Sequence, residues 1–522
     1  MIMDSDASTV GPRARRRQRA KTVWIVGGVL VVAAAIVVVV AVSAIGSRSG
    51  TLVNNCETGP GAQCPGANLS GTDLSTEDLS AADLSGANLD GANLTNVNLT
   101  GANLTGANLT GADLTGAVLP FIVSGGITGT PKTLPGGWTL VNGYLIGPSS
   151  NLTGALLTAS DLTDANLTGA NLTDATLTQA NLTGASLTDA NLTNASLTGA
   201  NLANANLTGV VLPYILSGDL NGAPRTLPAG WTLVNGYLVG PWANLTDALL
   251  AGADLSGDDL TNANLTHAKL TDANLTDANL TGANLTDLTS GGILGTPRAL
   301  PAGWTLANGY LIGSWANLAG ANLTGVDLTG ADLTTANLTR ANLTDANLTR
   351  ANLTGADLTG ANLTRATLTR ATLTDASISG ANLTDANLMD ANLTDLTSGG
   401  ISGTPSSLPT GWTLANGYLI GSSANLAGAN LTGVDLTGAD LTGVNLTGAN
   451  LTGANLTRAT LIRATLTDAS ISGANLTGAD LTDVVSSGLI GPPASLPDGW
   501  TIVDGSLTSP LTSPPTSTVA AP

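Results

Sequence analysis

The chain is poor in the residue types that carry most enzyme chemistry. Its 522 residues include one histidine, two cysteines and one phenylalanine, and only 10% of them are charged. The sequence also lacks a phosphate-binding loop, a nucleophile elbow and a cluster of metal ligands. We therefore expect no enzyme activity, no cofactor and no metal site, and we interpret the single histidine, His267, as an exposed residue.

Basic residues are scarce beyond the first 48 positions. The whole chain holds 17 Lys and Arg against 36 Asp and Glu, which gives a formal charge of −19. Seven of the basic residues and two of the acidic ones lie in residues 1–48, so residues 49–522 hold ten basic and 34 acidic residues and carry −24. Such an acidic surface disfavours direct binding to nucleic acid, because Lys and Arg make most of the contacts to phosphate.

What the chain does have is a period of five residues. The stretch GANLTGANLTGADL, residues 101–114, repeats a unit with leucine at its centre. In an α-helix these leucines would spread over every face, and in a straight strand alternate leucines would point to opposite faces. The period suits a chain that turns once in each unit, with Leu and Ala inside and Asn outside. Repetition of this turn predicts a coil whose successive layers pair through their backbones.

The unit resembles the A(D/N)LXX signature of the pentapeptide-repeat family. The resemblance implies an all-β fold, a right-handed, four-sided parallel β-helix with four units in each coil. Within each block of repeats the central leucines recur every five residues, with Ile378 and Ile471 as replacements. We expect the β-helix to span residues 66–483. Its five blocks are 66–120, 150–213, 243–287, 316–395 and 424–483.

Charged residues at the corners of the coil predict its size. With four units in each coil, residues twenty positions apart stack directly above each other, so that Asp345, Arg365 and Asp385 form one column of alternating sign. A coil of three units would instead stack Arg350 under Arg365 and remove the alternation. We therefore expect Asp345 and Arg365 to be neighbours.

The first 45 residues predict a membrane anchor. A basic segment, 1–22, precedes twenty uncharged and mainly apolar residues, 23–42, a length that suits one transmembrane helix. The positive-inside rule then places the N-terminus in the cytoplasm, a signal-anchor helix at 23–45 in the cell membrane, and the repeats outside the cytoplasm. A cleaved signal peptide is the alternative, with VSA at 42–44 as the cleavage site and a secreted product.

The only two cysteines, Cys56 and Cys64, follow the apolar segment. In an exported chain a pair this close predicts a disulfide, and residues 46–65 would then form a closed linker or cap for the first coil. Free thiols and a metal site are the alternatives, although no histidine stands nearby to complete a metal site. At the other end, we expect residues 484–522 to be a degenerate spacer and a disordered Ser/Thr/Pro tail.

Aromatic spacers separate the blocks of repeats. In each internal spacer Asn-Gly lies between two short apolar runs, which predicts a β-hairpin. Around the first of these turns Leu140 would pair with Leu145, with Trp138 on the same face. An alternative is that the two runs form distorted units of the wall, since Leu140 and Leu145 are also five residues apart.

The spacer aromatics have two interpretations. They are a row of binding platforms for a glycan or a protein partner, or each Trp covers a small core beneath its hairpin. We favour the second interpretation, because the apolar face of each hairpin needs somewhere to pack. The candidate platform consists of Trp138, Tyr144, Trp231, Tyr237, Trp304, Tyr310, Trp412 and Tyr418.

Together these features predict a non-enzymatic scaffold, an acidic β-helical rod tethered to the membrane through residues 23–45. Its partner would be a protein or a glycan that the sequence does not identify. One alternative is binding to ice or another surface through flat ladders of Asn and Thr, such as Asn103 and Thr105. The family resemblance implies a second alternative for a cytosolic chain, a DNA-mimicking inhibitor of gyrase.

Overall fold

The structure is a computed structural model that describes residues 51–509. The predicted basic segment 1–22, the predicted transmembrane helix 23–45 and the end of the predicted tail, 510–522, lie outside the described residues. Within the described range no helix has the length and apolar character needed to cross a membrane.

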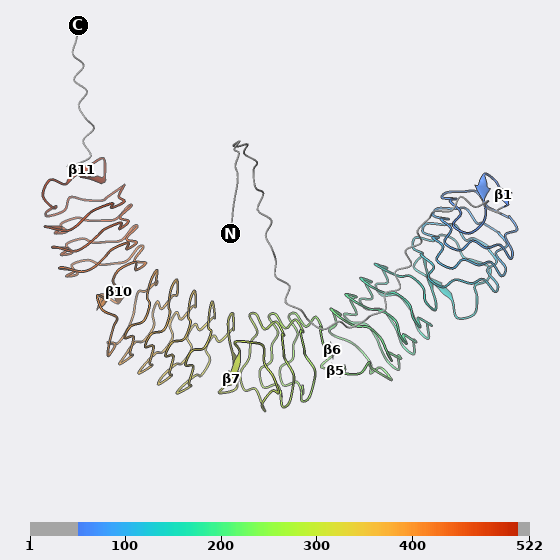
Figure 1. Cartoon of the computed structure of the whole chain (residues 1–522), viewed down its shortest axis with the longest axis horizontal. Coiled ribbons are helices and arrows are strands. Elements are labelled where there is room, and N and C mark those ends of the chain that lie inside the picture. Colours follow the sequence, from blue (N-terminus) through green and yellow to red (C-terminus); the bar gives the residue numbers. More distant parts are fainter. Residues whose placement is uncertain (1–50, 510–522) are drawn as a thin grey trace, which may run out of the picture. The chain divides into compact units, whose positions relative to one another are not determined.

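Residues 51–509 form a series of stacked coils (Figure 1). Outward-facing residues pair in parallel with residues twenty positions further on, from the pair Gln63 and Asp83 to the pair Asn475 and Ser495. Twenty residues are four five-residue units, so the four-unit coil is confirmed. Each pairing is a single bridge rather than a strand, because the chain stays extended for only two or three residues before it turns.

A regular unit makes three backbone hydrogen bonds to the next coil and has one left-handed corner residue. The amide of Leu104, for example, donates to the carbonyl of Val123 at 2.8 Å. The following corner residue, Gly106, has a φ of +70°, a conformation that glycine adopts without steric cost. Asp345 and Arg365 occupy equivalent corners at φ values of +59° and +56°, so the corner tolerates side chains at some cost in backbone energy.

Leucine and alanine fill the interior of the coils. Leu104 and Ala102 are completely buried, and the central residues of the other units are buried in the same way. Asn103 lies between them and points outward, because successive residues of an extended segment alternate between two faces. Each buried leucine contributes about 1.5–3 kcal/mol of transfer free energy before the cost of ordering the chain is subtracted.

The named strands all belong to short antiparallel hairpins. In the first internal spacer Leu140 pairs with Leu145 and Val141 pairs with Tyr144, as predicted, so the alternative of two distorted wall units is wrong. The turn residues Asn142 and Gly143 both have positive φ, as the favoured two-residue turn requires. The strands are β1 (Leu52–Val53), β2 (Cys56–Glu57), β3 (Thr139–Val141), β4 (Tyr144–Ile146), β5 (Thr232–Val234), β6 (Tyr237–Val239), β7 (Thr305–Ala307), β8 (Tyr310–Ile312), β9 (Thr413–Ala415), β10 (Tyr418–Ile420), β11 (Thr501–Val503) and β12 (Ser506–Thr508).

The wall extends further than the leucine pattern indicates. The first half of each spacer stays in the parallel ladder, where Thr128 pairs with Asn108 and Thr133 pairs with Asp113. Only the hairpin is added, so one coil at each internal spacer has 28 residues instead of 20, as the bridge from Val123 to Asn151 shows. The ladder also begins before residue 66 and ends after residue 483, because a bridge depends on the backbone and not on a central leucine.

Four hairpins lie across the interior and divide it; we call them the septum hairpins (β3–β4, β5–β6, β7–β8 and β9–β10). Leu145 belongs to the hydrophobic core that precedes the first of them, and its neighbour Ile146 belongs to the core that follows. The same division falls at residues 238/239, 311/312 and 419/420. Because neighbouring strand residues face opposite ways, each septum hairpin is apolar on both faces and separates two cores.

The two terminal hairpins, β1–β2 and β11–β12, resemble the septum hairpins in sequence but carry polar residues on their outer faces. TLVNNCET at 51–58 and TIVDGSLT at 501–508 align with TLVNGYLI at 139–146. At the N-terminal end the exposed Glu57 replaces the buried Leu145 on the outer face. At the C-terminal end Thr508 replaces Ile146 on the outer face, while Leu507 stays buried below. Each described end of the coil stack is therefore closed by a hairpin whose apolar face points inward.

Candidate functional site

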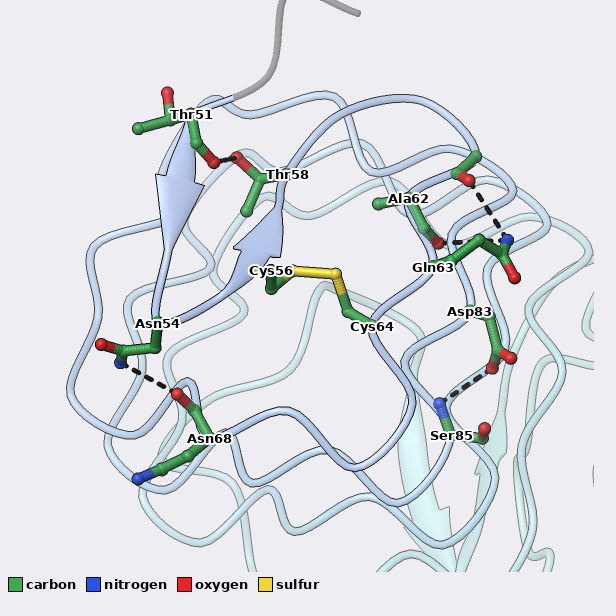
Figure 2. Close-up of a disulfide and its surroundings, with 11 residues drawn as sticks. Thr51, Asn54, Cys56, Thr58, Ala62, Gln63, Cys64, Asn68, Asp83 and Ser85 are labelled. Atoms are coloured by element: carbon green, nitrogen blue, oxygen red, sulfur yellow. Dashed lines mark hydrogen bonds between the residues drawn. A yellow bond between two sulfur atoms is a disulfide. The ribbon is translucent and has the colours of Figure 1, made fainter.

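Cys56 and Cys64 form a disulfide at the N-terminal hairpin (Figure 2). Cys64 stands five residues before Leu69, at a central position of the wall, and Cys56 stands where Tyr144 stands in the first septum hairpin. Both cysteines are buried, and their Cα atoms are 5.4 Å apart. The bond therefore joins the terminal hairpin to the inside of the first coil.

The tryptophans of the candidate platform are packing residues of the septum hairpins. The indole of Trp138 lies against Gly147, where a Cβ atom would overlap the ring, and Trp231, Trp304 and Trp412 lie in the same way against the glycine nine residues further on. Trp138 packs on the core below its hairpin, as predicted. These rings are partly buried between coils, which agrees with the packing interpretation.

The tyrosines of the platform tie each septum hairpin to the coil above it. The Tyr144 hydroxyl accepts a hydrogen bond from the amide of Leu156 at 3.1 Å, and the Tyr237 hydroxyl accepts one from the amide of Leu249 at 3.1 Å. Tyr310 and Tyr418 repeat the contact at 3.2 Å. A fixed phenol of this kind anchors the hairpin to the coil above, and each of these four rings is half-buried.

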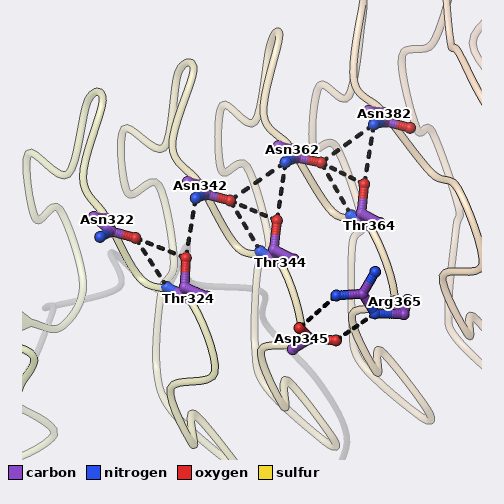
Figure 3. Close-up of polar contacts among 9 residues, drawn as sticks. All are labelled: Asn322, Thr324, Asn342, Thr344, Asp345, Asn362, Thr364, Arg365 and Asn382. Carbon is purple, nitrogen blue, oxygen red and sulfur yellow. Dashed lines mark hydrogen bonds and ion pairs between the residues drawn. The ribbon is translucent and has the colours of Figure 1, made fainter.

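The polar wall is hydrogen-bonded to itself along the stack (Figure 3). The Asn342 side-chain oxygen accepts from the amide of Thr344 at 3.2 Å and from its hydroxyl at 2.7 Å. The Asn342 amide group donates to the hydroxyl of Thr324 in the coil below at 3.0 Å. Asn362 repeats the pattern one coil further on. The threonine hydroxyls of this ladder are thus already engaged within the wall.

Corner charges pair between coils as the four-unit coil predicts. The Arg365 guanidinium donates to both carboxylate oxygens of Asp345, each at 2.7 Å (Figure 3). This guanidinium lowers the pKa of the Asp345 carboxyl. Arg370 Nε lies 3.7 Å from Asp390 Oδ2 in a neighbouring column. All of these side chains are exposed, so the pairs fix register more than they add stability.

His267 and Asp258 are two titratable groups that differ from the regular corner and wall residues in their surroundings. His267 is more than half exposed and lies between two corner carboxylates, with Nδ1 3.3 Å from Asp247 and Nε2 3.5 Å from Asp287. Asp258 occupies an inward position that holds Ala in most units and accepts a hydrogen bond from Thr232 at 3.1 Å. Burial raises the pKa of Asp258. Within residues 51–509 no cluster of His, Cys, Asp or Glu is arranged to hold a metal ion.

The sequence analysis missed a second set of aromatic residues, which lie on the outside of the wall. Tyr214 and Trp242 form an edge-to-face pair with ring centroids 5.7 Å apart and an interplanar angle of 68°. Phe121 and Trp315 stand at similar corners beside other hairpins. The signal was available, because these four residues occupy the fifth position of a unit, where Gly, Asp, Asn or Arg usually stands.

Comparison with protein families gives a match over more than half of the chain. The matching family model is described as pentapeptide repeats. It matches residues 78–119, 150–189, 175–212, 242–277, 259–288, 316–355, 356–395, 422–458 and 445–483. No curated protein matches the sequence.

Three solved structures are among those similar to this chain. HetL, a pentapeptide repeat protein involved in heterocyst differentiation regulation from the cyanobacterium Nostoc, is 25% identical over 66% of this chain and 92% of its own, with a TM-score of 0.15. Rfr23 from the cyanobacterium Cyanothece is 22% identical over 34% of this chain and 90% of its own, with a TM-score of 0.11. A pentapeptide repeat protein from the Arabidopsis thaliana thylakoid lumen is 24% identical over 30% of this chain and 70% of its own, with a TM-score of 0.07.

Proposed function

Because the chain belongs to the pentapeptide-repeat family, we propose that it serves as a membrane-tethered, extracytoplasmic scaffold without enzyme activity. The observation that carries this proposal is the parallel ladder that runs from Gln63 to Ser495 with hydrogen-bonded Asn and Thr side chains along it. A wall whose polar groups are already paired keeps one shape when a partner binds, so little conformational entropy is lost on binding. The partner would be a protein or a glycan.

Two features support a location outside the cytoplasm. The basic segment 1–22 followed by the apolar run 23–42 is typical of a signal anchor. The disulfide between Cys56 and Cys64 suits an oxidising compartment, since cytosolic thiols are kept reduced. Alkylation of cysteines in intact cells, followed by mass analysis, should find both cysteines protected until a reductant is added.

Reporter fusions placed after residue 60 test the topology directly. We expect activity from a reporter that works only outside the cytoplasm, and none from its cytosolic counterpart. The opposite result would contradict the tether and would revive the gyrase-inhibitor alternative, which needs a cytosolic chain. If the reporters confirm the topology, chemical cross-linking of the anchored protein in cells, followed by purification, would identify the protein partner.

The ladder in Figure 3 favours a scaffold over a surface that binds ice. Thr344 donates its hydroxyl proton to Asn342 and accepts a hydrogen bond from Asn362, so the hydroxyl has little capacity left for an ordered water layer. We expect the purified chain to leave the growth of ice crystals unchanged. Inhibition of recrystallisation at micromolar concentration would contradict this expectation.

A further inference from the structure

Four aromatic residues stand at strained corners of the wall. Phe121, Tyr214, Trp242 and Trp315 have φ values between +60° and +63° and are 43–62% exposed. A bulky residue rarely adopts this left-handed conformation, and Gly, Asp or Asn would adopt it at lower cost. A strained residue that the fold does not require points to a role in binding.

Of these four residues, Tyr214 and Trp242 have rings that contact each other. They stack in successive coils, where the Tyr214 amide donates to the Trp242 carbonyl at 2.7 Å and the rings meet edge to face. Val211 and Leu216, which are 44% and 38% exposed, stand on the two wall faces that meet at this corner. The result is an apolar edge with two accessible π-systems, whose electron-rich faces attract cations.

The wall face beside this pair is acidic at its other edge. Leu216 stacks under Asn244 on this face. The next corner along the chain carries Asp219 in the lower coil, where the turn residue Gly236 lies against it, and Asp247 in the upper coil. The Asp247 side chain is 74% exposed. The sequence has no Lys or Arg from 133 to 224 and none from 226 to 268, so Lys and Arg offset few of the carboxylates in this part of the wall. The basic group next to Asp247 is the imidazole of His267, with Nδ1 3.3 Å from Asp247 Oδ1. The face therefore presents an aromatic edge, an apolar centre and an acidic edge.

We propose that this face, from Tyr214 and Trp242 to Asp219 and Asp247, docks a basic peptide segment of a partner protein. One arginine of the segment stacks on the ring pair, an apolar residue lies over Leu216, and a second basic residue pairs with the carboxylates. A peptide fits better than a quaternary ammonium ligand, because a guanidinium donates N–H groups to carboxylates and a quaternary ammonium has none. The inference deepens the scaffold function proposed above and rests on it.

Fluorescence anisotropy of the full chain with a labelled peptide, in which two arginines flank one leucine, tests the proposal. We expect saturable binding that weakens at high salt. The double variant Tyr214→Gly/Trp242→Gly should bind at least tenfold more weakly. Glycine suits these corners, so the variant should keep the circular dichroism spectrum of the wild type. The matched control Phe121→Gly removes an equivalent ring at another hairpin and should bind the peptide as the wild type does.

Three results would overturn the proposal. They are no binding by the wild type, equal binding by the double variant, and equal binding of a peptide with glutamine in place of both arginines. Displacement of the peptide by choline at a similar concentration would assign the corner to a quaternary ammonium ligand instead of a peptide. A cytosolic result from the reporter fusions would contradict the scaffold's location but would leave these binding measurements unchanged, so the two failures are distinguishable.

Discussion

Replacement of Gly147 by alanine tests whether the septum hairpins are tightly packed layers. A Cβ atom at this position would overlap the indole ring of Trp138, which is held between the hairpin and the core below. Gly147 lies outside the left-handed region, so the substitution adds no backbone strain. Overpacking of this kind costs about 1–3 kcal/mol. Gly136, in the same spacer, has no atom within 4 Å of the corresponding Cβ position and also lies outside the left-handed region.

Gly136→Ala is therefore the matched control, and we expect it to stabilise the fold by about 0.4–1 kcal/mol through the lower entropy of the unfolded chain. Hydrogen exchange measured on peptides that cover 138–147, together with thermal unfolding, should show faster exchange and earlier unfolding for Gly147→Ala alone. The reasoning is refuted if the two variants behave alike. Gly240, Gly313 and Gly421 stand against tryptophans in the same way and allow the test to be repeated at each septum hairpin.

Three further predictions follow from the ends and the interior of the stack. Replacement of Cys56 and Cys64 by serine should lower the stability of the first coil by about 2–3 kcal/mol, with faster hydrogen exchange at the N-terminal hairpin and no change beyond the first septum hairpin. Burial raises the pKa of Asp258 above 3.8, so the stability that depends on its protonated form is present at low pH and is lost as the pH rises through the raised pKa. Asp258→Asn should then match the wild type in thermal unfolding at about pH 3 and unfold later at about pH 7; a constant difference between the two would contradict this. Ser506→Tyr combined with Thr508→Ile rebuilds an apolar outer face on the C-terminal hairpin and should raise the mass measured by light scattering, whereas an unchanged mass would show that this face does not control association.

Much of the fold was predictable because the pattern that encodes it is local. A leucine every five residues excludes helix and strand. Asp345 and Arg365 are twenty positions apart in the sequence and are bonded to each other, which agrees with four units in each coil. The Asn-Gly turns placed the hairpins correctly. The extension of the wall through Thr128 and Thr133 was missed, because these residues keep the backbone pairing without the usual Asn-Leu pair.

The function of each hairpin as a septum could not be read from its own sequence. Leu145 and Ile146 are both apolar, but only their position across the stack shows that one faces the core below and the other faces the core above. The exposed pair of Tyr214 and Trp242 was missed for a similar reason, since residues 28 positions apart become neighbours only where a hairpin lengthens the coil. Alignment of 51–58 with 139–146 would have identified the N-terminal hairpin from the sequence.

Because each coil holds four units, the number of units between two hairpins determines the face of the β-helix at which the next hairpin begins. From 151 to 216 the wall advances 65 residues, or 13 units, and from 244 to 289 it advances 45 residues, or nine units. Both numbers leave a remainder of one when divided by four, so the next hairpin begins one face further round the β-helix. From 317 to 397 the wall advances 80 residues, or 16 units, and the next hairpin returns to the same face.

Insertion or loss of one five-residue unit would therefore turn every later surface by a quarter turn while leaving the local packing intact. A change of four units would move those surfaces along the axis without turning them. Selection can thus alter the direction in which a binding face points, such as the face beside Tyr214 and Trp242, without altering any residue of the face itself.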